Sequence, residues 1–269
     1  MSYVFLLFFV WMTVTLTTDW GDDLYAGMAC GALLRALPGA SLVTLSHHIA
    51  PFQLVEAVHV LRTGYVHFPP GTVHILSVNG EQSVRIPYVA LRHDGHFFVG
   101  ADNGFAGLLT DVAPEEMVCI EKFTDAGSAS FAALSVLIPA AAWLAGGGRL
   151  SDLGRPYASS VHVRNVLPSM TSASMVGRAV YIDSYRNVVT NITRHDFERA
   201  ARGRAFEIWV GSAHYRITKI SERYGDVPDG ELVALFNVSG FMEIAMNKGA
   251  LADMLSLSLQ STVLVKFYD

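Results

Sequence analysis

The pattern of hydrophobic residues changes near the middle of the chain, and this change restricts the folds that the chain can adopt. From Met12 to about Ala145, strand-like and helix-like runs alternate, which predicts a mostly parallel sheet with crossover helices. From 150 to 174 the chain is polar, contains Pro and Ser, and has no clear periodicity. Beyond it, short strand-like runs such as FEIWVG and TVLVKFYD are separated by turn residues, which is typical of an antiparallel barrel or sandwich.

The length and the composition agree with a division into two parts. A chain of 269 residues can form one large domain or two modest ones, and each can bury a core. Because 51% of the residues are hydrophobic and 16% are charged, we expect a compact protein without long disordered tails. We predict an α/β N-terminal domain with a mostly parallel sheet at 1–160, a linker at 161–174 and an all-β, barrel-like C-terminal domain at 175–269.

Charge and cysteine content restrict the partners and the compartment. The net charge is −5 and no run is rich in Lys or Arg, so nothing favours nucleic acid as a partner. The two cysteines, Cys30 and Cys119, lie in no close-spaced metal or redox pattern and suggest no disulfide framework. We therefore expect a cytoplasmic protein.

The first residues form an apolar run, YVFLLFFVWMTV, from Tyr3 to Val14. The run is too short to span a bilayer, so we expect no membrane partner. No Lys or Arg precedes it and no small-residue cleavage site follows it, which argues against a secretory signal. Two interpretations remain: the run extends the first strand, or translation starts at Met12.

Hydrophobic spacing and turn residues indicate individual elements of the first part. Apolar residues recur at helical spacing from Tyr25 to Leu37, where Pro38 and Gly39 end the helix. The alternating run VALRHDGHFFVG is centred on an Asp-Gly pair, which indicates a β-hairpin. The other expected elements are strands at 13–18, 41–45 and 73–78, a helix at 52–61, and a buried helix at 129–144 that is interrupted near Pro139.

Three carboxylates, Asp19, Asp22 and Asp23, follow the first predicted strand in TTDWGDD. Ligands of open parallel sheets bind beyond the carboxyl ends of the strands, so these side chains are candidates for a binding site. They can instead cap the next helix and interact with its N-terminal dipole. Asp22 and Asp23 suit the cap, whereas Asp19, nearest the strand, is the better ligand candidate.

Two other polar groups allow a functional and a structural interpretation. His47-His48 and the histidines of HDGH resemble metal ligands, but the second pair flanks a probable hairpin turn and no acidic residue with helical ligand spacing accompanies them. We therefore predict no metal site. In IDSYRNVVTNI, Asp183, Asn187 and Asn191 lie between two strand-like runs, which is typical of a turn or of a recognition loop.

Several segments, taken in their order, are similar to one enzyme family. They are TLTTDWGDD, SHHIAPFQLVEAVHVL, FPPGTVHILSV, FVGADNG, YIDSYRNVVTNI and FMEIAMNKG. Together they resemble the S-adenosylmethionine hydroxide adenosyltransferases, a family that also contains the S-adenosylmethionine-dependent fluorinase and chlorinase. The resemblance covers nearly the whole chain from Met12 onward, and the ordered set is far more specific than any one segment.

The resemblance implies an architecture and a reaction. It implies an α/β domain, a β-barrel domain and a homotrimer whose active sites lie between the N-terminal domain of one subunit and the C-terminal domain of its neighbour. Such enzymes place a nucleophile behind C5′ of S-adenosyl-L-methionine (SAM) and displace methionine. In the hydroxide branch the enzyme is a hydrolase that forms adenosine and L-methionine, with SAM as the substrate and no metal or redox cofactor.

The resemblance also assigns roles to residues that match the family's substrate-binding positions. In the N-terminal domain, Asp19 matches the carboxylate that holds the ribose diol, Asp23 a residue near the methionine end, and Phe52 the aromatic residue over the ribose face. In the C-terminal domain, the matching positions are Asp183 for the methionine ammonium, Asn187 for the adenine edge, and Ser239 and Asn247 for the segment that closes the amino-acid and adenine ends.

The chain departs from the family at the residues that activate water. Hydroxide-forming members carry an Asp-Arg-His set, but this chain has Asn79 at the Asp position, Arg85 for the Arg after a shift of one residue, and Ala132 at the His position. Val238 stands where relatives often have Ser, at the methionine carboxylate. An amide is no general base and alanine accepts no proton.

Three functions are compatible with these replacements. In the first, the protein is a SAM hydrolase in which Asn79 and Arg85 orient a water molecule. In the second, the nucleophile is an anion such as chloride, which needs placement but no base and for which the small Ala132 leaves room. In the third, the protein binds SAM or adenosine without catalysis.

Overall fold

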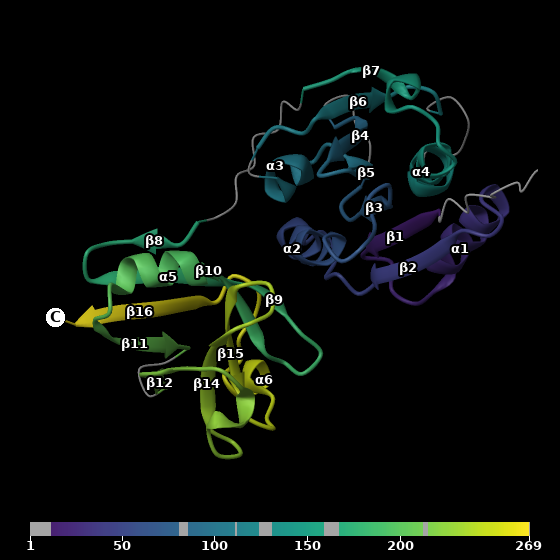
Figure 1. The fold of residues 1–269 in the computed structure, drawn as a ribbon. Coiled ribbons are helices and arrows are strands. Elements are labelled where there is room, and N and C mark those ends of the chain that lie inside the picture. Colours follow the sequence, from purple (N-terminus) through teal and green to yellow (C-terminus); the bar gives the residue numbers. More distant parts are fainter. Residues whose placement is uncertain are drawn as a thin grey trace, which may run out of the picture. The chain divides into compact units, whose positions relative to one another are not determined.

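The computed structural model describes residues 12–80, 86–110, 112–123, 131–158, 167–211 and 215–268. The chain divides into two compact units, Met1–Arg164 and Asn165–Asp269, which are described separately (Figure 1). The two interpretations of the apolar run at 3–14, an extension of the first strand or a translation start at Met12, concern residues that lie largely outside the described part. No helix among the described residues has the length and apolar character needed to cross a membrane.

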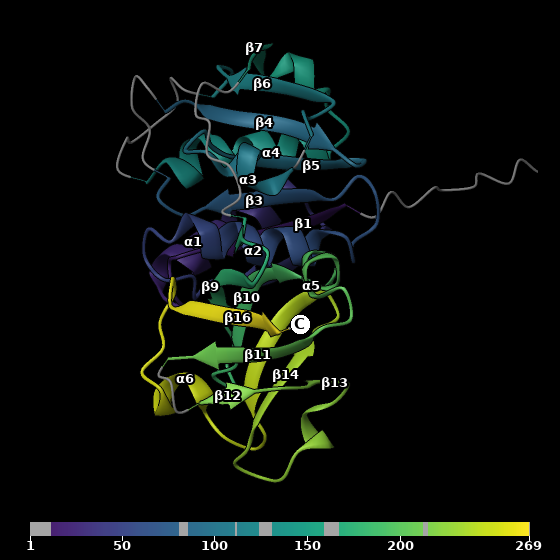
Figure 2. The same cartoon turned by 90° about the vertical axis from the view of Figure 1, so that its left-hand side faces the viewer.

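The first unit is built on one seven-stranded sheet with the order β2-β1-β3-β5-β4-β6-β7 (Figure 2). Its strands are β1 (Thr13–Thr18), β2 (Ser41–Ser46), β3 (Val73–Ser77), β4 (Tyr88–His93), β5 (His96–Ala101), β6 (Glu116–Ile120) and β7 (Gly154–Pro156). The strands expected at 13–18, 41–45 and 73–78 are therefore confirmed as β1, β2 and β3.

This sheet is mixed, so the prediction of a mostly parallel sheet is wrong. Strands β2, β1, β3 and β5 pair in parallel, whereas β5–β4, β4–β6 and β6–β7 pair antiparallel. The hairpin predicted around Asp94-Gly95 is confirmed: His93 pairs with His96, and both turn residues have positive φ, 50° and 74°. Both central residues of a two-residue type I′ hairpin turn need positive φ. A strand reversed by such a turn cannot pair in parallel with its partner, and β6 then continues the antiparallel half.

Helices cover both faces of this sheet. On one face, α1 (Leu24–Ala36) and α4 (Ile138–Ala145) pack on β1 through Leu33, Leu144 and Leu16. On the other face, α2 (Leu54–Tyr65) and α3 (Phe105–Leu109) pack on Phe98 of β5. The interruption expected near Pro139 is confirmed, because a π-helical segment, Ala133–Leu137, precedes α4 and the proline lies in the first turn of α4.

The second unit is a nearly closed, barrel-like sheet with the order β12-β11-β16-β9-β10-β15-β14-β13, and β8 is added beside β9. The strands are β8 (Ser169–Met170), β9 (Ser174–Ile182), β10 (Val188–Thr193), β11 (Ala205–Val210), β12 (Arg216–Ile217), β13 (Ile220–Ser221), β14 (Leu232–Phe236), β15 (Phe241–Met246) and β16 (Thr262–Tyr268). Their inward side chains form one core that includes Met175, Ile208, Ile244 and Val265. Strand β8 lies within the stretch predicted as a linker, and the linker residues 161–166 are outside the described part.

The described part of the second unit also contains two α-helices and a short 3-10 helix, Tyr224–Asp226, so the expectation of an all-β domain needs a correction. Helix α5 (Arg194–Ala201) is preceded by Thr193, whose hydroxyl oxygen accepts a hydrogen bond from the Asp196 backbone N–H at 3.1 Å. This is an N-cap, and it starts a helix between β10 and β11. Helix α6 (Leu251–Met254) follows β15 and contributes Leu251 to the core.

Candidate functional site

The parallel strands of the first unit end at one edge of the sheet, and polar residues follow them there. Thr18 of β1 pairs with Ser77 of β3, so Asp19 and Asn79 follow neighbouring strand ends. The chain passes from β1 to β2 on one side and returns to β3 on the other side of β1. Such a reversal of strand order is where open α/β sheets form ligand sites.

Asp19 is held against the loop that follows β2. Its Oδ2 accepts a hydrogen bond from the Phe52 backbone N–H at 3.3 Å. Two backbone bonds join the same loops: Gly21 N–H to the His47 carbonyl at 2.7 Å, and Ile49 N–H to the Thr18 carbonyl at 3.3 Å. The structure thus brings together Asp19 and Phe52, two of the residues predicted to contact the ribose.

Phe52 has an unusual conformation for a large apolar residue. Its φ is +66° and 72% of its surface is exposed. The left-handed conformation costs about 1 kcal/mol or more for a residue with a Cβ, and such strain is concentrated at functional sites. An exposed ring held at this cost is suited to pack on a ligand beside the Asp19 carboxylate.

The other two carboxylates of the cluster have different partners. Asp23 is the N-cap of α1, and its Oδ1 accepts a hydrogen bond from the Tyr25 backbone N–H at 3.2 Å. Asp22 instead pairs with Nε2 of His48 at 2.9 Å, with both side chains exposed. The expected cap is therefore correct for Asp23 and wrong for Asp22.

His47 is fixed at the same edge by hydroxyl groups and not by an acidic ligand set. Thr18 Oγ1 lies 2.7 Å from its Nδ1 and Thr44 Oγ1 lies 3.1 Å from its Nε2. Its ring stacks on Trp20 at a centroid distance of 6.2 Å, and burial lowers the pKa of His47. Within the described ranges, no three His, Cys, Asp or Glu side chains are grouped as metal ligands require.

Asn79 lies in a loop whose backbone is held by two side chains. Its φ is +48°, and Asn103 Nδ2 donates to the carbonyls of both Val78 and Asn79 at 3.0 Å. The hydroxyl of Tyr88 donates to the Gly80 carbonyl, also at 3.0 Å. The loop start is thereby fixed at the sheet edge, whereas Arg85 lies outside the described residues.

Ala132 lies just before the π-helical segment on the face covered by α1. Its neighbour Phe131 packs on Trp20 at a centroid distance of 5.1 Å and on Tyr25 at 4.8 Å. Trp20 directly follows Asp19, so Ala132 is linked to the same edge through this aromatic contact. Its methyl group offers neither a proton acceptor nor a hydrogen-bond donor.

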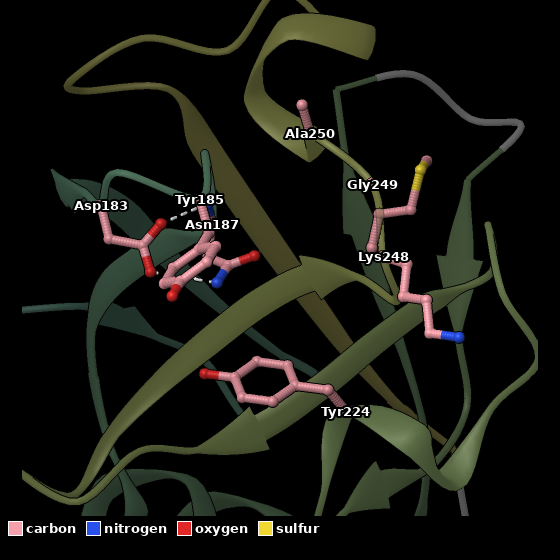
Figure 3. Close-up of a pocket in the computed structure, with 8 residues that line it drawn as sticks. Asp183, Tyr185, Asn187, Tyr224, Lys248, Gly249 and Ala250 are labelled. Carbon is pink, nitrogen blue, oxygen red and sulfur yellow. Dashed lines mark hydrogen bonds between the residues drawn. The ribbon is translucent and has the colours of Figure 1, made fainter.

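The second unit contains a pocket of about 720 Å³, which is within the usual size range for small-molecule sites (Figure 3). The pocket is lined by a carboxylate, an amide, two tyrosines and the end of β15: Asp183, Asn187, Tyr185, Tyr224, Met246, Lys248, Gly249 and Ala250. Figure 3 shows Asp183 and Asn187 facing each other on one side, while the amine of Lys248 points away from them.

Asp183 and Asn187 close a tight turn between β9 and β10. The two carboxylate oxygens of Asp183 accept hydrogen bonds from the backbone N–H of Asn187 at 2.7 Å and from its Nδ2 at 3.0 Å. Asp183 N–H donates to the Asn187 carbonyl at 3.1 Å. The turn and recognition interpretations of this segment are thus compatible, because the turn itself presents both side chains to the pocket.

Tyr224 is the aromatic wall of the pocket, and its position depends on a buried carboxylate. Its hydroxyl donates to Glu243 Oε1 at 2.6 Å, and Asn237 Nδ2 lies 3.3 Å from the other oxygen. Burial, and then the hydrogen bond to Glu243, raise the pKa of the Tyr224 hydroxyl. The tyrosine stays neutral, and its ring is held in place for packing.

Ser239 and Asn247 are not among the residues that line this pocket. Ser239 lies in the β14–β15 turn, where its N–H donates to Asn237 Oδ1 at 3.1 Å. Asn247 Nδ2 donates to the Val227 carbonyl at 2.8 Å and to Asp229 Oδ1 at 3.3 Å. The side chain of Asn247 therefore holds a neighbouring loop, while the residues on either side of it line the pocket.

Some residues at these sites were not predicted from the sequence. Tyr224, Tyr185 and Lys248 line the pocket, and Asn103 holds the Asn79 loop. Tyr185 lies inside the quoted segment IDSYRNVVTNI, so its position was a usable signal. Asn103 and Lys248 lie inside the quoted segments FVGADNG and FMEIAMNKG, so their positions were usable signals as well, although their contacts were not. No local pattern marks Tyr224, which lies 19 residues before its partner Glu243.

Comparisons with known proteins agree on one family. Residues 14–154 match the family model described as the SAM hydroxide adenosyltransferase N-terminal domain, and 177–264 match its C-terminal domain. The chain is 28% identical to (R)-S-adenosyl-L-methionine hydrolase of Thermus thermophilus, over 89% of this chain and 94% of that protein. The chain is 26% identical to the (R)-S-adenosyl-L-methionine hydrolase of Salinispora arenicola, over 91% of this chain and 94% of that protein. A crystal structure of an uncharacterized conserved protein from Thermotoga maritima superposes with a TM-score of 0.83 at 28% identity, covering 94% of this chain and 99% of that one.

Proposed function

The chain belongs to the SAM hydroxide adenosyltransferase family, and we propose that it is an enzyme that hydrolyses SAM at C5′ to adenosine and L-methionine. The observation that carries the proposal is the Asp19 carboxylate beside Phe52 at the reversal of strand order. A carboxylate there can accept hydrogen bonds from both hydroxyls of a ribose, while the exposed ring covers the sugar face. Asp23 remains a proposed contact near the methionine end.

The pocket of the second unit supports the proposed contacts to the rest of the substrate. Its tyrosine rings provide flat apolar surfaces for adenine, and Asn187 offers an amide to the base edge. The Asp183 carboxylate supplies a negative charge for the ammonium group of the methionine part. Ser239 and Asn247 keep their proposed role in closing this end, through the backbone of their segments.

The reaction needs little from the protein beyond placement. Water forms a bond to C5′ as the C5′–S bond breaks, the sulfur keeps the bonding electron pair, and one proton is released. The positive charge of the sulfonium disappears, so a dry site that solvates this charge poorly favours the transition state over the ground state. Because Asn79 is no base and Ala132 has no acceptor, we propose that Asn79 and Arg85 orient the water and that the proton leaves to solvent.

The identity of the nucleoside product tests this function. The purified protein is incubated with SAM, with and without chloride, and the nucleoside is identified by mass spectrometry. We expect adenosine, formed faster than in a protein-free control and independently of chloride. Formation of 5′-chloro-5′-deoxyadenosine would show that the nucleophile is chloride and not water. Binding of SAM without turnover would show that the protein binds SAM and does not catalyse its hydrolysis.

We also propose a homotrimer in which the N-terminal domain of one subunit and the C-terminal domain of its neighbour supply each active site. Co-expression of Asp19→Ala and Asp183→Asn subunits tests this. When equal amounts of the two subunits assemble at random, about a quarter of all sites combine an intact N-terminal half with an intact C-terminal half, because the interface is heterologous. We expect about a quarter of the wild-type activity, although each variant alone is inactive. If the mixed trimers were inactive, we would conclude that both halves of each active site belong to the same subunit.

We propose a cytoplasmic location as well. The support is chemical: Cys30 and Cys119 are both free thiols, and free thiols persist in reducing compartments.

A further inference from the structure

The second unit contains a second hollow, formed by three arginines, that the proposed reaction does not use. It has a volume of about 550 Å³ and lies where the end of α5 meets the turn between β8 and β9. Arg199, Arg202 and Arg204 line it together with the hydroxyl residues Thr171 and Ser172, and the other lining residues are apolar. Three cations around one hollow are unusual in a chain with a net charge of −5.

Two of these guanidinium groups are held in place by the fold. Arg204 donates from Nε to the Ala201 carbonyl at 3.2 Å and from a terminal nitrogen to the Ala200 carbonyl at 2.8 Å. Its guanidinium carbon also lies 5.1 Å from the centre of the Phe267 ring. Arg199 pairs with Asp196 at 3.1 Å. Arg199 retains further N–H donors, because a guanidinium has five.

The side chain of Arg202 is not held by contacts of this kind. It is exposed, and within the described ranges no carboxylate or carbonyl pairs with its side chain. It ends α5 in the left-handed conformation, with φ +50° and ψ +32°. Glycine is the favoured residue there because a Cβ makes this conformation costly. Arg202 thus has a costly backbone conformation and no described ion pair, and it lies beside two guanidinium groups that are held in place. Stability of the fold does not explain this arrangement.

We propose that this arginine hollow binds a small molecule that carries a phosphate or polyphosphate group. Guanidinium groups match phosphate oxygens with paired N–H donors, and a bound anion would give Arg202 the charged partner that it lacks among the described residues. Ser172, whose hydroxyl has no partner among the described residues, adds a donor. The volume exceeds that of a single phosphate and suits a small organic phosphate. A single hollow on an acidic chain is unlike the extended basic surface that nucleic acid requires.

Titration calorimetry of the full-length protein with tripolyphosphate tests the site, with Arg202→Gly as the variant. Glycine suits the left-handed position, so this variant keeps or raises the melting temperature while it removes the unpaired cation. We expect affinity for tripolyphosphate to fall at least tenfold. Lys219→Gln is the matched control, because Lys219 is an exposed cation of the same unit outside the hollow, and its affinity should equal that of the wild type.

A parallel titration with cytidine triphosphate separates free polyphosphate from a phosphorylated metabolite as the occupant. This nucleotide lacks adenosine, so it does not compete for the proposed SAM site. Tighter binding than that of tripolyphosphate supports an organic phosphate, and equal binding supports recognition of the phosphates alone. The proposal is overturned if the wild type binds neither compound at millimolar concentration, if Arg202→Gly binds as the wild type does, or if Lys219→Gln loses as much affinity as Arg202→Gly.

Discussion

Replacing Asp19 with alanine is expected to lower the affinity for SAM and for adenosine by at least a hundredfold and to abolish turnover. The carboxylate is proposed to accept hydrogen bonds from both ribose hydroxyls, and the loss of two bonds to a charged acceptor costs about 3 kcal/mol, or roughly a hundredfold in affinity. Because its one described hydrogen bond, from Phe52 N–H, is long at 3.3 Å, the variant should fold. Calorimetric titration with adenosine measures the effect.

Asp22→Ala is the matched control for this experiment. It removes a carboxylate from the same loop, but Asp22 pairs with His48 at the surface, where 75% of its side chain is exposed. An exposed pair contributes about 0–1 kcal/mol, so neither affinity nor stability should change much. If Asp19→Ala binds adenosine normally, or if both variants lose affinity equally, the ribose assignment is wrong and the cluster serves only the loop and the helix.

Acidification is expected to destabilise the first unit strongly through a buried histidine pair. His74 of β3 is fully buried, with its Nδ1 2.7 Å from Thr15 Oγ1 and its Nε2 3.1 Å from Nδ1 of His96. The rings of Tyr65 and Phe98 pack around it. Burial, and then the neighbouring His96, lower the pKa of His74 to about 3. Burial also lowers the pKa of His96, against a smaller opposing effect of Asp94.

The direction of the pH effect follows from these pKa values. Below pH 6.5 the unfolded chain binds a proton at His74, whereas the folded chain binds none until the pH approaches 3. The contribution to stability is therefore complete above pH 6.5 and is lost progressively as the pH falls toward 3. Each bound proton changes the free energy of unfolding by about 1.4 kcal/mol per pH unit, so about 3 kcal/mol is lost from His74 between pH 6.5 and 4.5.

Chemical denaturation at pH 7.0 and pH 4.5 measures this effect in the wild type and in His74→Gln. Glutamine keeps hydrogen-bonding capacity toward Thr15 and His96 but does not titrate, so the variant should lose about 3 kcal/mol less than the wild type on acidification. His67→Gln replaces an exposed histidine and should follow the wild type. Equal acid sensitivity of His74→Gln and the wild type would show that other groups cause the loss.

Local patterns predicted the elements better than they predicted their arrangement. The Asp94-Gly95 turn, the break near Pro139 and the strand before Asp19 are encoded within a few residues, and all three are present in the structure. The Asp94-Gly95 hairpin already indicated one antiparallel pair, but β4 pairs with β6 across α3 and its loops, so no local pattern predicted that the antiparallel pairing continues beyond the hairpin. Helix α5 was missed although its cap is local, because the surrounding strand-like runs dominated the pattern.

The candidate site also contains some residues that local sequence patterns indicated and others that only long-range contacts revealed. The carboxylates after β1 and the pair Asp183 and Asn187 were visible in the sequence, since each belongs to a short segment in which polar side chains interrupt apolar runs. Asn103, which holds the loop of Asn79, and Tyr224, which depends on Glu243, became recognisable only through contacts between distant segments. Hydrophobic periodicity and turn chemistry act over a few residues, so most strands and most candidate side chains could be predicted from the sequence. Strand order and side-chain packing depend on the whole chain. The extent of antiparallel pairing in the sheet, the capping of α1 by Asp23 instead of Asp22, and the side chains that hold the site in place therefore became evident from the folded structure.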